Sequence, residues 1–282
     1  MSSYPLPYVA SEAARKAEVM NHTPVKYFVS SMLAGMLIAV VLSVSLMLGQ
    51  ALRLEGSLLY YAASAGFFGT ALCSIIVGRV ELFTSNIMYM TVGRMAGRIS
   101  SADMLKSWAI VYFGNFAGAL LFAVVYAQTG VMANLPVDHL LYFVVGHKVA
   151  AAFWAIFWKG VLCNWIICLA VWLPLRLSND MAKLALIMLL VFVFFFSGYE
   201  HSIANMAFFS LSWMFSVSGT PGLSDTLHNM IPATLGNIVG GGLGVGALMF
   251  YLERDTLGEV ESEAASAPQS APVAPASRLS HG

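Results

Sequence analysis

Charged residues are scarce in this sequence, and their scarcity argues against a water-soluble domain. Only 10% of the 282 residues are Asp, Glu, Lys or Arg, whereas a soluble domain carries about 25%. The 14 basic and 14 acidic residues balance, so no excess positive charge is available to bind nucleic-acid phosphates. With 59% hydrophobic residues and a mean hydropathy of +0.78, the composition predicts one polytopic membrane domain.

Cysteine and catalytic motifs are equally sparse. The three cysteines, Cys73, Cys163 and Cys168, lie in apolar stretches, and their odd number and unpaired spacing predict no disulfide framework. The C-x4-C pair reads better as small apolar helix residues than as metal ligands. No phosphate-binding loop, metal cluster or nucleophile–base pair occurs, so we expect no enzyme activity, no cofactor and no metal.

Long apolar runs are what the sequence does contain. About 20 apolar residues cross a bilayer, and four uncharged runs reach that length: 27–52, 56–78, 107–137 and 226–252. Two further runs are interrupted by single charged sites: 149–175 by Lys159, and 184–224 by Glu200. The second run also continues beyond Arg79 and Glu81 into an apolar piece, 82–93. We therefore predict an all-α protein with six transmembrane helices, of which the second and fifth are broken.

The spans divide the chain into three parts. Residues 1–26 are polar, lack the apolar region of a cleaved signal peptide, and are expected to form a surface helix at about Val9–Met20. Residues 27–254 form the six-span transmembrane domain. Residues 255–282, rich in Ala, Pro, Ser and Glu, read as a disordered tail.

Basic residues predict the orientation of these spans. Lysine and arginine concentrate in cytoplasmic loops, and one side of a six-span chain holds ten of the fourteen: Arg15, Lys16, Lys26, Arg94, Arg98, Lys106, Arg176, Lys183, Arg254 and Arg278. Both termini belong to that side and are expected in the cytoplasm. The fifth loop, around Gly219–Asp225, has no Lys or Arg and is expected outside.

The two halves of the chain contain a weak internal repeat. Glu and Asn stand five residues apart at Glu81 and Asn86 and again at Glu200 and Asn205, 119 residues later. A Gly-Asn pair at 114–115 returns at 236–237, an offset of 122. Three spans separate equivalent points, so the halves are expected to have opposite topology. Inverted repeats with a broken helix in each half are typical of transporters, with the substrate site where the breaks meet.

Several motifs resemble the signature of the formate/nitrite transporter family. They are Glu81-Leu82-Phe83-Thr84-Ser85, Tyr112-Phe113-Gly114-Asn115, Leu162-Cys163-Asn164-Trp165 with Cys168-Leu169-Ala170, Phe196-Ser197-Gly198-Tyr199-Glu200-His201-Ser202-Ile203-Ala204-Asn205-Met206, and Leu235-Gly236-Asn237. They occur in order over about residues 24–252. The resemblance implies an aquaporin-like homopentamer in a bacterial inner membrane, with one pore per protomer for nitrite, formate or hydrosulfide.

Some motifs indicate the branch within this family. The segment 159–165, Asn205-Met206, Leu211-Ser212-Trp213 and Leu227-His228-Asn229 resemble the nitrite branch, as does the short fifth loop. The segment 238–242 instead resembles formate members. We therefore favour nitrite as the substrate and keep formate as the alternative.

The breaks contain the residues expected to contact substrate. His201 is the one histidine placed within a broken span, and intramembrane ionisable residues are commonly functional. An unperturbed imidazole titrates near pH 6.5, so His201 is suited to hold an anion or to give it a proton. Thr84 is expected opposite His201 as a hydroxyl donor or a helix cap. Beside them we expect Glu200, Asn164, Asn205 and Asn237, where the asparagines either contact substrate or join helices.

The remaining site residues follow from position. By resemblance, the pore constrictions above and below His201 are Phe68, Leu72, Leu82, Phe83 and Phe194, whose bulk would exclude water and hydrated ions. Lys148 is expected at the outer entrance, either attracting anions or snorkelling to the interface. Lys159, at mid-depth, needs a carboxylate, the pore or a protomer interface. Arg79 departs from the small residue usual in the family and is a candidate partner of Glu81 or Glu200.

Two other classes of protein were weighed. A neutral-solute channel of aquaporin type has six spans and two half-breaks, but aquaporins carry Asn-Pro-Ala at each break, and neither break here contains proline. A membrane-embedded enzyme or haem-binding redox anchor needs several histidines within spans, and only His201 qualifies. The sequence therefore favours an anion channel, proton-coupled or passive.

Overall fold

The computed structural model describes residues 4–133, 135–215 and 221–258. Within them all regular secondary structure is helical, as predicted. The helices are α1 (Pro5–His22), α2 (Pro24–Leu54), α3 (Tyr60–Gly78), α4 (Phe83–Met95), α5 (Ser101–Ala127), α6 (Leu140–Ala150), α7 (Phe153–Trp172), α8 (Asp180–Phe196), α9 (Ser202–Met214), α10 (Leu223–Gly241) and α11 (Leu248–Glu253). A 3-10 turn, Leu173–Arg176, follows α7, and a π-helix, Gly242–Ala247, joins α10 to α11. The end of the tail after residue 258 and residues 219–220 of the fifth loop lie outside the described residues.

In the described part of the chain, five helical segments are long and apolar enough to cross a membrane: Pro24–Leu54, Tyr60–Gly78, Ser101–Ala127, Phe153–Arg176 and Leu223–Glu253. The third begins six residues before the expected apolar run and ends ten residues before its expected end. Its start is fixed by a capping box, in which Ser100 Oγ accepts from Asp103 N and Asp103 Oδ2 accepts from Ser100 N. Capping, rather than hydrophobicity, therefore determines where this helix begins.

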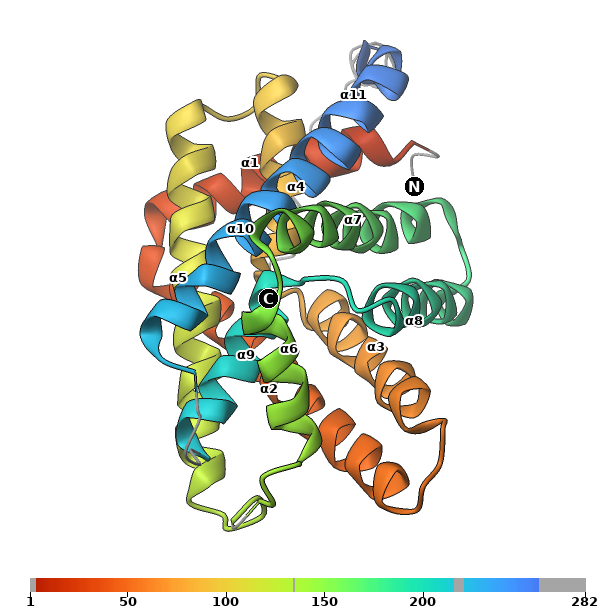
Figure 1. Ribbon diagram of the computed structural model, residues 1–282. Coiled ribbons are helices and arrows are strands. Elements are labelled where there is room, and N and C mark those ends of the chain that lie inside the picture. The colour runs from red at the N-terminus through yellow and green to blue at the C-terminus, as the bar shows by residue number, and fades with distance from the viewer. Residues whose placement is uncertain (1–3, 134, 216–220, 259–282) are drawn as a thin grey trace, which may run out of the picture.

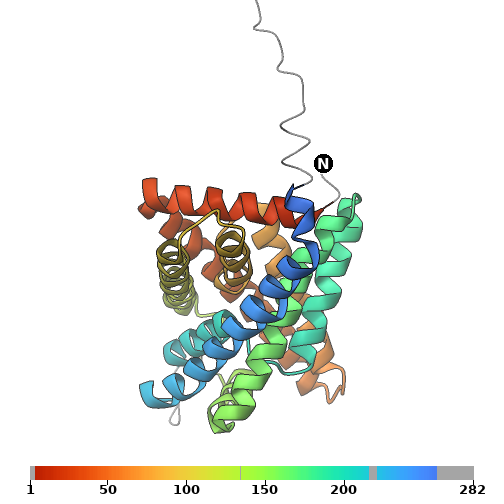
Figure 2. The same cartoon turned by 90° about the horizontal axis from the view of Figure 1, so that it is seen from above.

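The helix α1 lies across one end of the bundle (Figure 2). It begins four residues before the expected Val9, with proline in its first turn, a position that tolerates the missing N–H. Its apolar face buries Leu6, Val9 and Met20. At the contact with α4, a Cβ on Gly93 would lie 2.4 Å from the Cβ of Ala13, so the glycine permits the close approach of α1.

Two tightly packed helix pairs build the two halves of the bundle. In the pair α2–α5, a Cβ on Gly35 would lie 2.0 Å from the carbonyl oxygen of Asn115, and one on Gly118 would lie 1.9 Å from that of Met32. In the pair α7–α10, Gly236 and Gly240 stand equally close to backbone oxygens of α7. Small residues allow such backbone contact between membrane helices. Gly236 and Gly240 of the last span thus serve tight packing.

The chain leaves the helical path at two points between apolar helices. After α3, Arg79 takes a left-handed conformation (φ 51°), and four residues pass before α4 begins. After α8, Gly198 is left-handed (φ 66°), and α9 begins at Ser202. The segment between α8 and α9 passes through the middle of the bundle (Figure 1). A left-handed conformation costs a non-glycine residue about 1–2 kcal/mol, so Arg79 is held there against its own preference.

A third interruption divides α6 from α7, where a single run, 149–175, was expected. Ala151 and Ala152 are extended (ψ 143° and 145°). Two carbonyls freed by the turn find partners on α10: Lys148 O accepts from Asn229 Nδ2 at 3.1 Å, and Ala151 O accepts from His228 Nε2 at 3.0 Å. Long-range hydrogen bonds therefore stabilise a bend that no proline or glycine marks.

Candidate functional site

The centre of the site is a contact between the two interrupted regions. Thr84, in the first turn of α4, and His201, the N-cap of α9, are both buried, and Thr84 Oγ1 lies 3.0 Å from His201 Nε2. His201 Nδ1 accepts from Ala204 N at 3.0 Å, so the neutral ring carries its proton on Nε2 and donates to Thr84. The Thr84 hydroxyl keeps its own proton, which is available to a third group.

Both helices begin at this contact. The positive ends of the α4 and α9 dipoles therefore meet near Thr84 and His201, an arrangement that favours negative charge. The sequence placed Thr84 opposite His201, and the structure brings them together. It also assigns the Nδ1 atom to capping, which leaves Nε2 and the threonine hydroxyl for chemistry.

Two cavities flank His201, which lines both together with Phe194, whereas Thr84 lines neither. The cavity on the Lys148 side, here the Lys148 cavity, has a volume of about 40 Å³. The other, here the Leu72 cavity, has about 10 Å³. One water needs at least about 10–15 Å³ of such volume. The Lys148 cavity therefore has room for a small anion or a few waters, whereas the Leu72 cavity is closed to hydrated ions.

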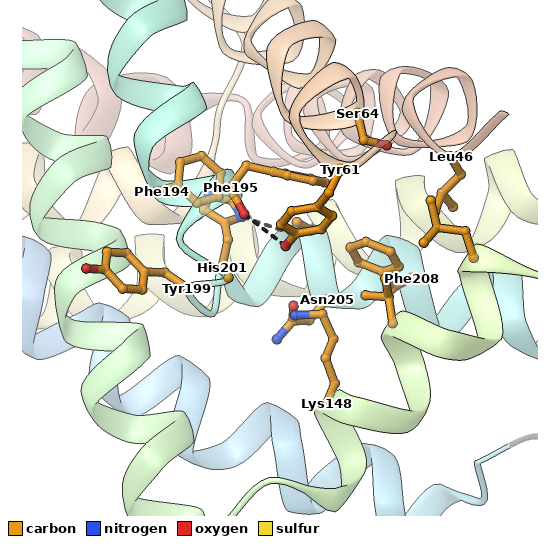
Figure 3. Close-up of a pocket in the computed structure, with 14 residues that line it drawn as sticks. Leu46, Tyr61, Ser64, Lys148, Phe194, Phe195, Tyr199, His201, Asn205 and Phe208 are labelled. Atoms are coloured by element: carbon orange, nitrogen blue, oxygen red, sulfur yellow. Dashed lines mark hydrogen bonds between the residues drawn. The ribbon is translucent and has the colours of Figure 1, made fainter. Parts of the chain in front are cut away.

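Figure 3 shows the Lys148 cavity. Phe194, Phe195 and His201 lie together on one side, and Tyr61 lies against them, donating its hydroxyl to the Phe195 carbonyl at 3.1 Å. Lys148 reaches in from α6 beside Asn205. Polar groups thus gather near the lysine, and aromatic rings surround the histidine.

Apolar side chains form the wall of the Leu72 cavity. Four of the five residues that the resemblance implied as constrictions, Phe68, Leu72, Leu82 and Phe194, line this one cavity. The Phe194 ring stacks on His201 (centroids 5.7 Å apart) and meets Phe68 edge-on at 6.1 Å. Phe83, the fifth expected constriction residue, is buried but lines neither of these two cavities, since its ring packs against Tyr112 at 5.0 Å.

An asparagine stabilises each of the two central interruptions, α3–α4 and α8–α9, in the same way. Asn115 Oδ1 accepts from Phe83 N, and its Nδ2 donates to the carbonyls of Ser31 and Glu81. Asn237 Oδ1 accepts from Ser202 N, and its Nδ2 donates to the carbonyls of Gly160 and Glu200. Each side chain therefore satisfies one N–H and one carbonyl that the interruption leaves free, and ties them to a carbonyl of a neighbouring helix.

We expect Asn115→Ala and Asn237→Ala to destabilise the protein by similar amounts. Each change leaves one N–H and one carbonyl of the interruption without its side-chain partner in a fully buried place, at about 1–3 kcal/mol per group. Thermal unfolding in detergent measures the loss. The control is Asn179→Ala, which removes a single exposed cap from α8. A loss no greater than in this control would contradict the bracing role.

A lysine, a glutamate and an asparagine also recur at each interruption. Glu200 Oε2 accepts from Lys148 Nζ at 2.9 Å and from Asn205 Nδ2 at 2.6 Å. Glu81 Oε2 accepts from Lys16 Nζ at 2.6 Å and from Asn86 Nδ2 at 3.0 Å. Lys148 is therefore half-buried and paired with Glu200, and it still lines the cavity.

The two Lys–Glu–Asn groups differ in the partner of the asparagine side-chain oxygen. Asn86 Oδ1 accepts from Ser107 Oγ at 2.9 Å. Asn205 instead donates to Asn229 Oδ1 at 2.8 Å, and its own Oδ1 is buried without a partner. Among the predicted asparagines, only Asn205 lines a cavity described above. Asn164 donates to the Thr84 and Asn237 carbonyls at 3.1 and 2.7 Å, so it joins the two interruptions instead.

The two cations whose partners the sequence left open lie away from this centre. Lys159 and Arg79 are exposed on the protomer, and no hydrogen bond or ion pair of either side chain occurs within the described part of the chain. Lys159 stands level with the second interruption, because its carbonyl accepts from Glu200 N at 3.4 Å. Arg79 pairs with neither Glu81 nor Glu200, whose carboxylates are taken by the two lysines.

Sequence reasoning missed Lys16 and Asn229, both of which bond a buried glutamate. The repeat held a signal for Lys16: once Lys148 is assigned to Glu200, an equivalent cation is expected for Glu81. The expected surface helix contains it, 65 residues before its partner. Asn229 had no such signal beyond the resemblance of its motif.

Comparison with known proteins agrees with this geometry. The sequence model described as formate/nitrite transporter matches residues 7–251. The nitrite transporter NirC of Escherichia coli (strain K12) is 37% identical over 246 residues, covering 86% of this chain and 89% of NirC. The formate channel FocA of the same organism is 32% identical over 264 residues, covering 86% and 92%.

Solved structures are similar over most of their length. An FNT family ion channel has a TM-score of 0.83 at 34% identity and covers 88% of this chain and 98% of its own. A pentameric formate channel with formate bound has a TM-score of 0.68 at 25% identity and covers 81% and 96%. These relatives are transporters and channels rather than enzymes. The chain therefore belongs to the formate/nitrite transporter family.

Proposed function

We propose that this protein is a membrane channel for small monovalent anions, with nitrite as the favoured substrate. The observation that carries the proposal is the Thr84–His201 contact, whose histidine lines both a cavity with room for a small anion and an apolar constriction. The test is uptake into proteoliposomes, comparing nitrite, formate and chloride across pH. Equal uptake of all three, or none, would contradict it.

Formate is the second candidate. The similarity to a formate channel solved with formate bound supports it, as does the segment 238–242. Nitrite and formate are both small, planar, singly charged anions of weak acids, and the hydroxyl and imidazole at the centre suit either. The higher identity to the nitrite transporter supports nitrite as the first candidate.

The proposed mechanism follows from the order of groups along the path. Lys148 lowers the energy of an anion in the Lys148 cavity, although Glu200 neutralises much of the charge of the lysine. Thr84 Oγ1–H then donates to the anion, while Thr84 Oγ1 continues to accept from His201 Nε2–H. For a proton to pass, the His201 ring first takes one up from solvent at Nδ1 and gives up the cap of α9. The Nε2 proton then moves to Thr84 Oγ1 as the threonine hydroxyl proton moves to the anion, which leaves a neutral ring and a neutral acid. The neutral acid crosses the Leu72 cavity without the large desolvation cost of an ion.

We further propose six spans in two inverted repeats. On this assignment α3–α4, α6–α7 and α8–α9 each form one interrupted span, while α2, α5 and α10–α11 are continuous. The distribution of Lys and Arg supports cytoplasmic termini, and the bacterial relatives support the inner membrane. The domain limits of 1–26, 27–254 and 255–282 belong to the same proposal.

An exposed face of α7 supports assembly into a pentamer. Trp154, Trp158, Leu162 and Trp165 are all exposed on the protomer, and Lys159 lies among them at mid-span. A lysine at the centre of a bilayer costs about 2.5–3.5 kcal/mol, and tryptophan prefers the membrane interface to its middle. Both features favour covering this face with a neighbouring protomer.

We expect a homopentamer with five separate pores and no conduction through the central axis. Native mass spectrometry of the detergent-solubilised protein measures the number of protomers. The interface is checked by Trp158→Cys. This cysteine should cross-link neighbouring protomers in the oligomer and should react with a thiol reagent only after the oligomer dissociates. Met181→Cys, at an exposed position of α8, is the control for labelling. A monomer or dimer with full transport activity would contradict the pentamer.

The two other classes are less well supported. A neutral-solute channel leaves the paired lysines and the central histidine without a role. A membrane enzyme or redox anchor needs clustered ligands, and no group of three or more metal-binding side chains occurs among the described residues. Family membership also favours transport.

A further inference from the structure

Arg79 combines three properties that rarely occur together. It is the one non-glycine residue with a positive φ in the described part of the chain. Its side chain is exposed on the protomer. Its guanidinium has no hydrogen bond or ion pair within residues 4–133, 135–215 and 221–258. Glycine adopts the left-handed conformation readily, so the side chain at this position needs a reason beyond the fold.

The position of Arg79 places it at one mouth of the proposed path. Arg79 N donates to the carbonyl of Ile76, and Val80 N donates to that of Ile75, at the turn that ends α3. Ile75, four residues before Arg79, and Leu82, three residues after it, both line the Leu72 cavity. The guanidinium also lies close enough to Tyr8 and Glu12 of α1 to act on them electrostatically. Arg79 therefore stands between the constriction and α1.

The other charges around this mouth are already paired. Glu12 accepts from Arg15 Nε and Nη2 at 3.0 and 2.7 Å, and Glu81 accepts from Lys16 at 2.6 Å. Each of these pairs is neutral as a unit. Among these five groups, the charge of Arg79 is the one left without an opposite partner.

We propose that Arg79 is an anion-capture residue, which raises the concentration of the permeating anion at the α1-side mouth. The inference rests on the proposed anion transport. It adds a first contact for the anion on the side of α1, where Lys16 is neutralised by Glu81. The guanidinium offers two parallel N–H donors, which match the two oxygens of a planar anion such as nitrite or formate.

The size of the effect follows from one unscreened charge. In water, an anion roughly 7 Å from a unit positive charge is enriched about threefold. Screening removes most of this gain once the Debye length falls to about 3 Å, near 1 M salt. The contribution of Arg79 should therefore be visible at low ionic strength and disappear at high ionic strength.

The experiment compares four variants in proteoliposomes, with nitrite and formate as probes at subsaturating concentration and fixed pH. At about 10 mM ionic strength, Arg79→Gln and Arg79→Gly should each lower the initial rate roughly threefold, and Arg79→Lys should restore most of it. At high ionic strength the rates should converge. The matched control is Arg94→Gln, which removes an exposed charge from the end of α4, beside α1.

Melting temperatures separate a structural role from the proposed one. Arg79→Gly relieves the left-handed side chain and should unfold at a higher temperature than Arg79→Gln, although both lose the charge. A wild-type salt dependence in Arg79→Gln would overturn the inference, and so would failure of Arg79→Lys to recover the rate. Absence of anion uptake by the wild-type protein would instead refute the proposed transport itself.

Discussion

Replacing His201 with phenylalanine is expected to abolish proton-coupled uptake. Phenylalanine keeps the stacking on Phe194 (5.7 Å in the native pair) but has neither the Nδ1 acceptor that caps α9 nor the Nε2–H that reaches Thr84. Removing one preorganised donor from a buried polar site costs roughly a hundredfold or more in rate. Initial uptake of nitrite and formate between pH 5 and pH 8 measures the effect.

The variant His201→Asn separates capping from protonation. Asparagine is a preferred N-cap, and it offers both an acceptor for Ala204 N and a donor for Thr84, but it does not titrate. Uptake that survives without its pH dependence assigns the proton to the histidine ring. An unchanged pH dependence in either variant, with an intact oligomer, would contradict protonation through His201.

The positions of the two central interruptions were predictable from sequence for a definite physical reason. A glutamate inside an apolar run cannot face lipid, and the recurrence of Glu and Asn at one spacing marked both places. The Gly-Asn pairs of the repeat proved to be the residues that satisfy the freed backbone groups, through Asn115 and Asn237.

Other features left no local trace in the sequence. The bend between α6 and α7 passes through two alanines and is stabilised by His228 and Asn229, 77 and 81 residues away from the carbonyls they bind. The pairing of Lys16 with Glu81 crosses 65 residues. Hydrogen bonds over such separations depend on tertiary packing, which periodicity and propensity do not encode.

The repeat also indicates where function lies, because it fails at the centre. Glu, Asn and the bracing asparagines recur at offsets of 119 and 122, and they hold the scaffold. At the offset of 119, Thr84 corresponds to Ile203 and His201 to Leu82. One half thus supplies the hydroxyl and the other the imidazole, and the equivalent position of the opposite half is apolar in both cases. The repeated asparagines and glutamates therefore surround a pair that is not repeated, and we propose that this pair carries the chemistry.

Truncating Phe194 to alanine is expected to weaken discrimination against chloride. Phe194 is 2% exposed, lines both cavities and packs against Phe68 and His201. Moving a bare ion through such an apolar slit costs far more than a few hydrogen bonds return, whereas a small neutral acid crosses at little cost. Wild-type uptake should therefore rise as external pH falls, and chloride, which stays charged, should be excluded.

Removal of the Phe194 ring should admit water to the slit and lower the cost for every ion. We expect the ratio of nitrite to chloride flux to fall about tenfold, equivalent to about 1.4 kcal/mol. The ring is fully packed, so the change also costs about 3–5 kcal/mol of stability, and Phe194→Leu preserves more volume as a second variant. The matched control is Phe192→Ala, which removes a ring stacked on Phe196 of the same helix and outside both cavities. If Phe194→Ala folds and keeps the selectivity of this control, the barrier to ions lies elsewhere along the path.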